Sequence, residues 1–530
     1  MKRRNFFKTA ALAGGTLAVA PLNSCVQPPV KDSIPEDYSA FELNELTITQ
    51  LQEKMSSGTL NSEEITQKYL DRIDRIDKNG PELHSVIEIN PEAIEIARQM
   101  DAERKAGKIR GSLHGIPVLI KDNIDTGDKM RTTAGSWALV GASAPDDAVL
   151  VRKLREAGAV LLGKTNLSEW ANFRSTHSSS GWSGRGGQVR NPFCIDRSPC
   201  GSSSGTGAAV SANLCVIGIG TETDGSIVCP SGINGTVGIK PTVGLWSGDG
   251  IIPISHSQDT AGPMARNVSD AAVLLGLLAE KDKGEGKVFA DYLQFLDANG
   301  LKNARIGIAS DFFGFHSGVE KLMADAIQTL KNAGAIIVEN LKFENREEWG
   351  KLEWQVLISE FKADLNTYLK SRTGLKVQSL ADLIEFNKKN SEKELRWFAQ
   401  EIFEEAEKTK GLEDPVYLEA RSKVHELTRK NGIDLLMDKH QLDALIAPTN
   451  GPSWTIDLVN GDHFGGGSSE AAAISGYPNI SVPAGYVHGL PVGISFFGRA
   501  WSEPTLIKLA YAYEQATKHR KAPGFLKNIE

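Results

Sequence analysis

Two serines framed by glycines and one lysine are the residues of this chain whose types and spacing could do chemistry. Ser202 lies in a Gly-Ser-Ser-Ser-Gly run, Ser226 ends a Thr-Asp-Gly-Ser run, and Lys121 follows the apolar run at 116–120. A serine hydroxyl is a weak nucleophile until a base takes its proton, and a lysine is a base only when its ammonium form is destabilised. Burial behind the apolar run would destabilise it. The pattern therefore predicts a serine hydrolase that works without histidine.

These residues resemble those of the amidase signature family, and most closely its peptide amidases, which cleave the C-terminal carboxamide of peptides. The resemblance covers residues 46–263 and 442–515, and the segment between them lacks short motifs. It implies Ser226 as the acylated nucleophile, Ser202 as the bridging serine that relays its proton, and Lys121 as the base.

The resemblance also implies how the developing charge is stabilised. Backbone N–H groups that point to the oxygen of the tetrahedral intermediate would form an oxyanion hole. The implied donors are the N–H groups of Thr223, Asp224, Gly225 and Ser226. The resemblance further implies a cis peptide bond between Gly201 and Ser202.

Four positions depart from the usual pattern of the family. Cys200, Ser204 and Asp224 stand where glycine is common, and Val228 stands where an arginine usually follows the nucleophile. A cation near the nucleophile suits a substrate that carries a carboxylate, so an apolar valine favours a neutral peptide chain. Asp224 would place negative charge beside an oxyanion unless its side chain points away and is hydrogen-bonded, and the sequence leaves its role open.

The resemblance therefore implies an amidohydrolase that converts a carboxamide to carboxylate and ammonia through an acyl-enzyme. The expected substrate is the C-terminal amide of a peptide, and the expected chemistry uses no metal or cofactor. A general aliphatic or aromatic amidase is the nearest alternative. A binding lipoprotein that has lost catalysis is another interpretation, against which the intact Lys121, Ser202 and Ser226 argue.

Two other motifs match formally, and their context argues against both. The run 158–165 fits the Walker pattern for nucleotide binding, but a helix expected over 147–157 and a buried strand over 159–162 leave no phosphate-binding loop. The run 201–205 fits the nucleophile elbow of α/β-hydrolases centred on Ser203, but a loop precedes it instead of a strand.

No metal or redox site is expected from the histidines and cysteines. The ten histidines form no His-Glu-x-x-His motif, and three that stand isolated are His114, His177 and His256. The cysteines show no Cys-x-x-Cys spacing. Cys194 and Cys200 would pair if their loop brings them together, and burial as free thiols is the alternative.

The first 24 residues resemble a twin-arginine export signal, in which a basic segment precedes a short apolar stretch. Cys25 then follows what looks like a bacterial lipoprotein cleavage site, so it would become the lipidated first residue, with residues 25–40 as a tether. A plain cleaved signal with an incidental cysteine is the alternative. The expected location is the periplasm or cell envelope, with membrane attachment only through the lipid.

The charge of the chain bears on its partners. The net charge is −7, and residues 1–24 carry four basic residues and no acidic one, so the mature chain would be more acidic still. Nucleic acids are bound through clustered basic residues. The sequence therefore predicts a small-molecule or peptide amide as the partner and disfavours a tRNA-dependent amidotransferase subunit.

The resemblance implies one large α/β domain over residues 41–530, a central mixed β-sheet covered by helices with the catalytic motifs at one edge. Local signals agree, since Asn61 and Glu64 have the spacing of a capping box at the start of a helix.

Residues 280–440 form the variable part of this domain. Strands are expected over 304–309 and 335–338 around a helix over 319–332, and residues 349–439 are charged with helical spacing, which predicts a helical cover. Aromatic residues of this segment are expected mainly in the core, with a minority at the substrate cleft: Trp349, Trp354, Phe361, Tyr368, Phe386 and Trp397.

Overall fold

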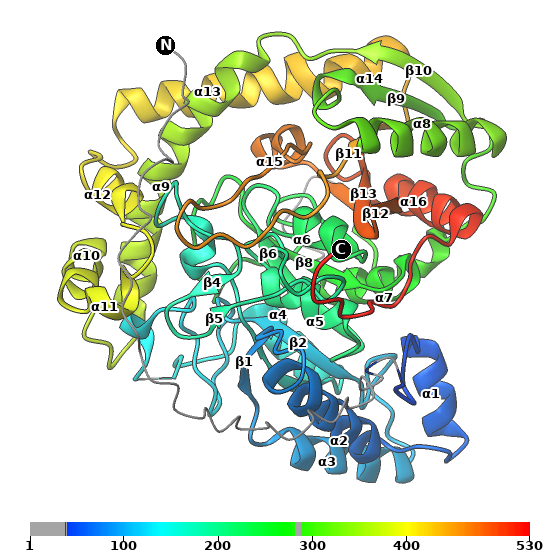
Figure 1. Cartoon of the computed structure of the whole chain (residues 1–530), viewed down its shortest axis with the longest axis vertical. Coiled ribbons are helices and arrows are strands. Elements are labelled where there is room, and N and C mark those ends of the chain that lie inside the picture. Colours follow the sequence, from blue (N-terminus) through cyan, green and yellow to red (C-terminus); the bar gives the residue numbers. More distant parts are fainter. Residues whose placement is uncertain (1–37, 39, 142, 281–287, 530) are drawn as a thin grey trace, which may run out of the picture. The chain divides into compact units, whose positions relative to one another are not determined.

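Parallel strands that end at one edge of a large sheet position the residues of interest. The computed structural model describes residues 38, 40–141, 143–280 and 288–529. From Tyr38 onward the chain forms one compact unit built on an 11-stranded mixed sheet (Figure 1). The fold class expected from the sequence is confirmed.

The predicted signal peptide, Cys25 and the tether as far as residue 37 lie outside the described residues, so they stay predictions. Within the described ranges, no helix combines the length and the apolar composition that crossing a membrane requires.

The sheet mixes parallel and antiparallel neighbours. β2 runs parallel to β3 and β6, and β9 runs parallel to β10 and β11, whereas the remaining neighbours are antiparallel. The order across the sheet is β1 (Val86–Ile89), β3 (Val160–Thr165), β2 (Pro117–Lys121), β6 (Ile217–Glu222), β8 (Thr260–Ala265), β7 (Val237–Lys240), β12 (Asn479–Val487), β13 (Leu490–Phe497), β11 (Ala444–Pro448), β9 (Arg305–Ala309) and β10 (Ile336–Leu341). A separate hairpin pairs β4 (Trp182–Ser183) with β5 (Gly187–Gln188).

β2 and β6 bring the lysine and the second serine motif to the same edge of the sheet. Their register pairs Ile120 with Ile219, so the two parallel strands end side by side. Every residue of β2 is buried, as expected of a parallel strand that is covered on both faces. The apolar run before Lys121 thus has the structural role that the sequence predicts.

Helices pack around this sheet. α2 and α3 lie against β2 and β3, α5 lies against β6 and β8, and α16 and α8 lie against β12 (Figure 1). The helices of the first half are α1 (Ile48–Ser56), α2 (Ser62–Arg72), α3 (Ala93–Lys105), α4 (Val149–Glu156), α5 (Ser204–Ser211), α6 (Val228–Ile233) and α7 (Val268–Leu278). Those of the second half are α8 (Ser317–Asn332), α9 (Trp349–Ser371), α10 (Leu380–Lys389), α11 (Ser391–Glu394), α12 (Glu401–Glu407), α13 (Pro415–Thr428), α14 (Asp434–His440), α15 (Glu470–Ser475) and α16 (Glu503–Thr517).

Local sequence signals appear where they were expected. Asn61 accepts a bond from the Glu64 N–H, and the Glu64 side chain bonds back to the Asn61 N–H, which completes the predicted capping box of α2. α4 ends before Gly158, whose φ of +77° is a left-handed conformation that glycine adopts without strain. Residues 160–165 then form the buried strand β3, so the Walker-like run has no phosphate-binding loop.

The segment 280–440 divides into two parts. β9, α8 and β10 match the expected strand, helix and strand, and they extend the main sheet at its far edge. The helices α9 to α14 form the expected helical cover, in which α9 packs against α12 and α13 (Figure 1).

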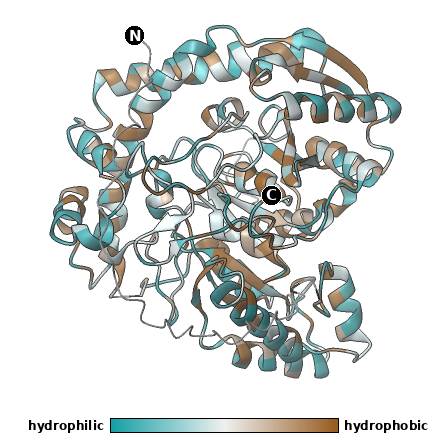
Figure 2. Ribbon diagram, viewed as in Figure 1, coloured by the Kyte–Doolittle hydropathy of each residue, from teal (hydrophilic) through white to brown (hydrophobic). Residues whose placement is uncertain are grey.

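The core follows the same division. One large apolar cluster fills the space between the sheet and the helices of the first half together with α8 and α16, and two smaller clusters lie under the helical cover. Trp349 and Phe361 are buried there, as predicted, whereas Trp354 is half-buried at the edge. Figure 2 shows apolar residues along the strands and hydrophilic residues on the outer turns of the peripheral helices.

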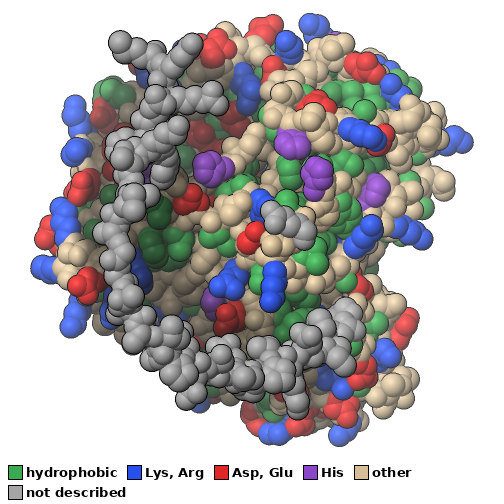
Figure 3. Space-filling view, in the orientation of Figure 1, with side chains coloured by type: hydrophobic (Ala, Val, Ile, Leu, Met, Phe, Trp, Pro, Cys, Tyr) green, Lys and Arg blue, Asp and Glu red, His purple; other side chains and the backbone are tan. Residues whose placement is uncertain are grey.

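On the face that Figure 3 shows, basic and acidic side chains are interspersed and do not form a broad basic patch.

Candidate active site

Lys121 occupies the centre of the site at the end of β2. Its side chain is fully buried, and Nζ lies 2.7 Å from Ser202 Oγ and 3.1 Å from Ser203 Oγ. Nζ also contacts the side chain and the carbonyl oxygen of Thr221, at 2.9 and 3.2 Å. Burial lowers the pKa of Lys121 to about 7, against the opposing effect of the negative charges of Asp259 and Glu222. A large share of this lysine is therefore neutral at neutral pH.

Ser202 is held by the close packing of its glycine-rich run. The Gly201–Ser202 peptide bond is cis, as the resemblance implies, and Ser202 is fully buried. A Cβ at Gly201 would collide with Ser168 Oγ, and one at Gly205 would collide with the carbonyl oxygens of Ser85 and Asn166. The glycines are needed because the chain packs directly against its neighbours, and α5 begins within the run.

Ser226 lies in the turn between β6 and α6. Its carbonyl oxygen accepts a hydrogen bond from the Ser203 N–H at 3.1 Å, which places it against the residue that follows Ser202. Ser226 is 8% exposed, whereas Ser202 and Lys121 have no exposed surface. The structure thus brings Lys121 into contact with Ser202. It also places Ser226 beside the same serine run, and Ser226 is the most exposed of the three residues.

The residues from Thr223 to Ser226, here called the 223–226 turn, offer unused hydrogen-bond donors. Within the described part of the chain, the N–H groups of Thr223, Asp224 and Ser226 have no protein acceptor. The next two N–H groups, of Ile227 and Val228, donate to the buried carboxylate of Glu222 at 2.7 and 3.0 Å, and the Gly225 N–H also faces that carboxylate. Three of the four N–H groups that the resemblance implies are therefore free, whereas that of Gly225 is directed to Glu222. Free donors gathered in one turn are the requirement for an oxyanion hole.

Asp224, whose role the sequence left open, is a largely desolvated carboxyl group. Burial raises its pKa to about 7, a hydrogen bond with Ser469 opposes this shift, and the negative charges of Glu222 and Glu470 add to it. Much of the group is therefore protonated at neutral pH. The negative charge beside Ser226 is correspondingly smaller than the sequence alone suggests.

Ser203 also contacts Lys121. Sequence analysis considered this serine only as the centre of a nucleophile elbow, the interpretation that the preceding loop argues against. Its hydroxyl donates to the Thr221 carbonyl oxygen at 3.0 Å and accepts from the Thr221 N–H at 3.1 Å. The elbow would need a strand before this serine, and residues 191–200 form none. Sequence analysis did not identify Thr221 as a contact of Lys121. Its position near the end of an apolar strand, two residues before Thr223, could have indicated that it lies at the site.

The disulfide differs from the pairing considered from the sequence. Cys200 bonds to Cys229, with the Cα atoms 6.1 Å apart, and Cys194 and Cys215 are buried free thiols. The pairing of Cys194 with Cys200 is therefore wrong. The contact between Ser203 and Ser226 brings the start of α6 to the serine run, and this carries Cys229 to Cys200, into a small apolar cluster with Ile233 and Trp454.

Loss of this disulfide is expected to destabilise the protein. Cys229→Ser opens a loop of 29 residues, and closing such a loop is worth about 3.6 kcal/mol of unfolding free energy. Urea unfolding of Cys229→Ser under non-reducing conditions measures the loss. Cys194→Ser is the matched control, because its hydroxyl can keep the contact of Sγ with Asp196. A peptide linking Cys194 and Cys200 in a digest of the unreduced protein would contradict the assignment.

Two hollows flank the residues 171–173. One, of about 360 Å³, is bounded by Asn123, Thr221, Thr223 and the loop 243–260. The other is an open cleft of about 590 Å³, lined by Asn172, Phe173, Ser175, Thr176, His177, Ser178, Trp354, Ile402, Asn460, Gly461, Asp462 and Phe464. Asn172, which lines this cleft, also lies beside Gly201 of the serine run.

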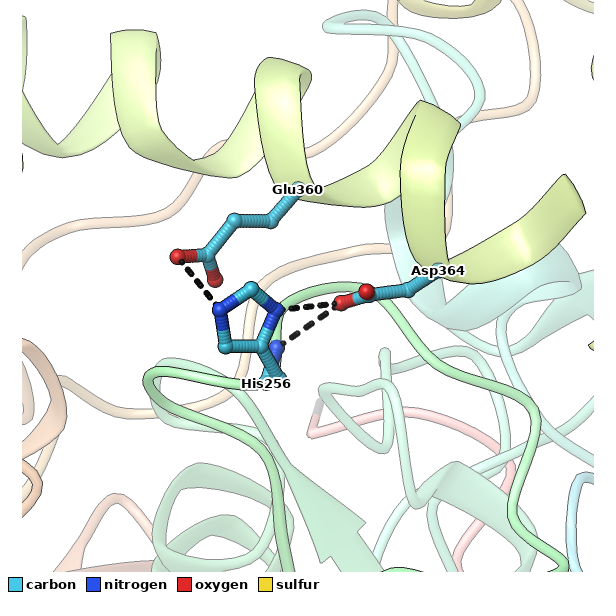
Figure 4. A group of neighbouring side chains, drawn as sticks. All are labelled: His256, Glu360 and Asp364. Atoms are coloured by element: carbon cyan, nitrogen blue, oxygen red, sulfur yellow. Dashed lines mark hydrogen bonds and ion pairs between the residues drawn. The ribbon is translucent and has the colours of Figure 1, made fainter. Parts of the chain in front are cut away.

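His256 is isolated in the sequence but lies between two carboxylates of α9 (Figure 4). Nδ1 is 2.8 Å from Asp364, and Nε2 is 3.2 Å from Glu360. The bond to Asp364 raises the pKa of His256, against its partial burial and with the help of both negative charges. These contacts occupy both ring nitrogens, so the group has the geometry of an imidazolium held by two carboxylates.

Comparison with known proteins agrees with this architecture. The family model described as Amidase matches residues 64–507. A probable amidase of Arabidopsis thaliana is 43% identical over 504 residues, which cover 92% of this chain and 93% of that protein. The structure of native peptide amidase from Stenotrophomonas maltophilia matches with a TM-score of 0.88 and 51% identity, over 92% of this chain and 100% of that one. Peptide amidase in complex with the competitive inhibitor chymostatin matches with a TM-score of 0.89 and 52% identity, over 91% and 100%.

Proposed function

Since this chain belongs to the Amidase family and is an amide-hydrolysing enzyme, we propose that it cleaves the C-terminal carboxamide of peptides with Ser226, Ser202 and Lys121. The observation that carries the catalytic part is the 2.7 Å contact between a buried lysine and Ser202. With its pKa lowered to about 7, Lys121 is a usable base at neutral pH.

The proposed reaction moves one proton along the serines. Neutral Lys121 accepts the proton of Ser202, Ser202 accepts the proton of Ser226, and Ser226 Oγ attacks the amide carbon. When the C–N bond breaks, the relay returns the proton to the leaving nitrogen, and ammonia departs. Water then attacks the acyl-enzyme with the help of the same base and releases the carboxylic acid and free Ser226.

The free N–H groups of the 223–226 turn support this assignment. They are fixed before substrate arrives, so they can stabilise the tetrahedral oxyanion without rearrangement. Loss of one such donor typically costs about 3 kcal/mol of transition-state stabilisation.

Three observations favour a peptide as the substrate. The cleft of about 590 Å³ beside Asn172, a neighbour of Gly201, has room for more than a small amide. Its walls combine aromatic rings, such as Trp354 and Phe464, with hydroxyl and amide groups that can bond to a peptide backbone. Val228, where the family often has arginine, leaves that position without a cation for a substrate carboxylate.

The proposal includes export, as residues 1–24 and Cys25 predict from the sequence. A disulfide at the catalytic loops accords with an oxidising compartment.

Ammonia release from an amidated dipeptide and from propionamide tests the substrate. We expect kcat/KM for the dipeptide amide to exceed that for propionamide by about 100-fold or more, because the remote part of the substrate contributes binding energy. The same dipeptide with a free carboxylate is the control and should give no ammonia. Preference for propionamide would favour a general aliphatic or aromatic amidase instead, and hydrolysis of neither would contradict both.

A further inference from the structure

A short segment, Ile254 to Asp259, holds the first residue of the 223–226 turn from two sides. Asp259 Oδ1 accepts the hydroxyl of Thr223 at 2.5 Å, and its Oδ2 accepts the N–H groups of Ile254 and Ser255. Gln258 Nε2 approaches the Thr223 carbonyl oxygen at 3.4 Å. Thr223, which supplies the first free N–H of the turn, is therefore held at its side chain and at its carbonyl oxygen. The peptide unit that contains this carbonyl oxygen carries the next free N–H, that of Asp224.

Helix α9 fixes the other side of this 254–259 segment (Figure 4). Glu360 accepts the hydroxyls of Ser255 and Ser257, each at 2.5 Å, and Asp364 binds His256. Glu353, which precedes Glu360 by about two turns on the same face of α9, accepts Gln258 Nε2 at 2.8 Å. The segment thus bridges the helical cover to the catalytic edge of the sheet.

We propose that Asp259 is a positioning residue for amide hydrolysis: its carboxylate orients Thr223 in the oxyanion turn and supplies a negative charge that acts on Lys121. The inference rests on the proposed function, because it assigns a task to Asp259 in the same serine and lysine site. The sequence gives no sign of it, since Asp259 lies 36 residues from Thr223.

The charge of Asp259 has a defined effect on the base. Two carboxylates act on Lys121, Asp259 and Glu222, and both raise its pKa against the dominant effect of burial. Asp259 itself faces the Thr223 hydroxyl, two backbone N–H groups and the negative charge of Asp364, and burial raises its pKa to about 6. Asp259 is therefore ionised where Lys121 titrates, near pH 7, and its removal should make the lysine easier to deprotonate.

Variants separate the two tasks. Asp259→Asn keeps a hydrogen-bonding group opposite Thr223 but loses the charge, so the acidic limb of the pH–rate profile should move to lower pH by about 1 unit, with kcat on the alkaline plateau nearly unchanged. Thr223→Val keeps the charge but loses the bond. Its kcat on the alkaline plateau should fall about 10-fold to 100-fold, because a misplaced oxyanion donor stabilises the transition state less well. KM and the pH of the acidic limb should not change. Asp259→Ala should show both effects.

Two controls make the pattern specific. Thr223→Ser restores the hydroxyl and should restore the plateau. Asp270→Asn neutralises another buried carboxylate, which accepts the Ile48 N–H and has no effect on Lys121, and should leave limb and plateau as in the unaltered protein. Thermal melting checks that each variant is folded. An unshifted limb in folded Asp259→Asn, or an unchanged plateau in folded Thr223→Val, overturns the inference.

Sulfonylation by phenylmethanesulfonyl fluoride gives a second readout that needs no amide. Ser226 Oγ would displace fluoride from sulfur, the proton would pass to the relay, and intact mass would follow the rate at each pH. The Asp259→Asn shift without any amide hydrolysis would contradict the proposed function and support the role of Asp259. Amide hydrolysis without the expected effects of the variants would support the proposed function and contradict the role of Asp259. If neither amide hydrolysis nor sulfonylation occurred, both proposals would be wrong.

Discussion

Alanine in place of Ser226 is expected to lower kcat for a peptide amide by about 10⁴-fold to 10⁶-fold and to prevent formation of an acyl-enzyme. Ser226 is the accessible member of the serine pair and lies at the end of the turn with free N–H groups. Without its hydroxyl, no covalent intermediate can form. Intact-mass measurement after rapid quenching detects the acyl adduct on the unaltered protein and its absence from Ser226→Ala.

The serine run provides the comparison for this result. Ser202→Ala should lose activity by a similar factor, because the proton of Ser226 then has no path to Lys121. Ser204→Ala is the matched control in the same run. Its hydroxyl is buried against Ser168 Oγ at 3.2 Å and takes no part in the relay, so activity should stay within a few-fold. Acylation of the Ser226→Ala protein on another residue would contradict the assignment of the nucleophile.

Removal of the base is expected to have the second largest effect. Lys121→Met keeps the length and apolar character of the buried stem but has no base, so kcat should fall about 10³-fold or more. Lys121→Arg keeps a positive charge that does not dissociate at neutral pH, and it should lose as much. Equal losses would show that the neutral amine, and not the charge, is needed.

The pH dependence of the unaltered enzyme carries the same information. The folded-state pKa of Lys121 is lowered to about 7, and in the proposed reaction its neutral form is the base. The rate should therefore be nearly constant above about pH 8, fall to about half near pH 7, and fall tenfold per unit below about pH 6. Initial rates of ammonia release from pH 5 to 9 measure this limb. A rate that stays constant down to pH 5, or an active Lys121→Arg protein, would argue for another base.

Short-range signals predicted much of the fold and of the site. Gly201 and Gly205 are visible in the sequence because direct contact of the backbone with its neighbours permits no side chain. The apolar run before Lys121 marks a buried strand, and the capping pair Asn61 and Glu64 marks a helix start. Each of these signals depends on residues a few positions apart, for which spacing and chemistry are sufficient evidence.

The remaining features depend on contacts between distant segments. Cys229 meets Cys200 only because α6 starts beside the serine run. Asp364 lies 108 residues from His256, and no spacing rule connects them. The N–H donors of the 223–226 turn have no side-chain signature, since any residue type can supply them, and only the resemblance implied them. Tertiary packing decides such contacts, and a single sequence does not encode it in a local pattern.

The bond between Cys200 and Cys229 closes a covalent ring of chain that contains α5, β6, Ser202 and Ser226. A protease that cuts once inside this ring leaves both serines on one molecule, whereas a cut elsewhere severs the chain. In the denatured, unreduced protein the ring limits how far the two serines can separate, so the effective concentration of one around the other stays high. When the unreduced protein refolds, Ser202 and Ser226 are therefore already held near each other by the ring. Lys121 lies outside the ring, so it reaches the two serines only by diffusion of the chain.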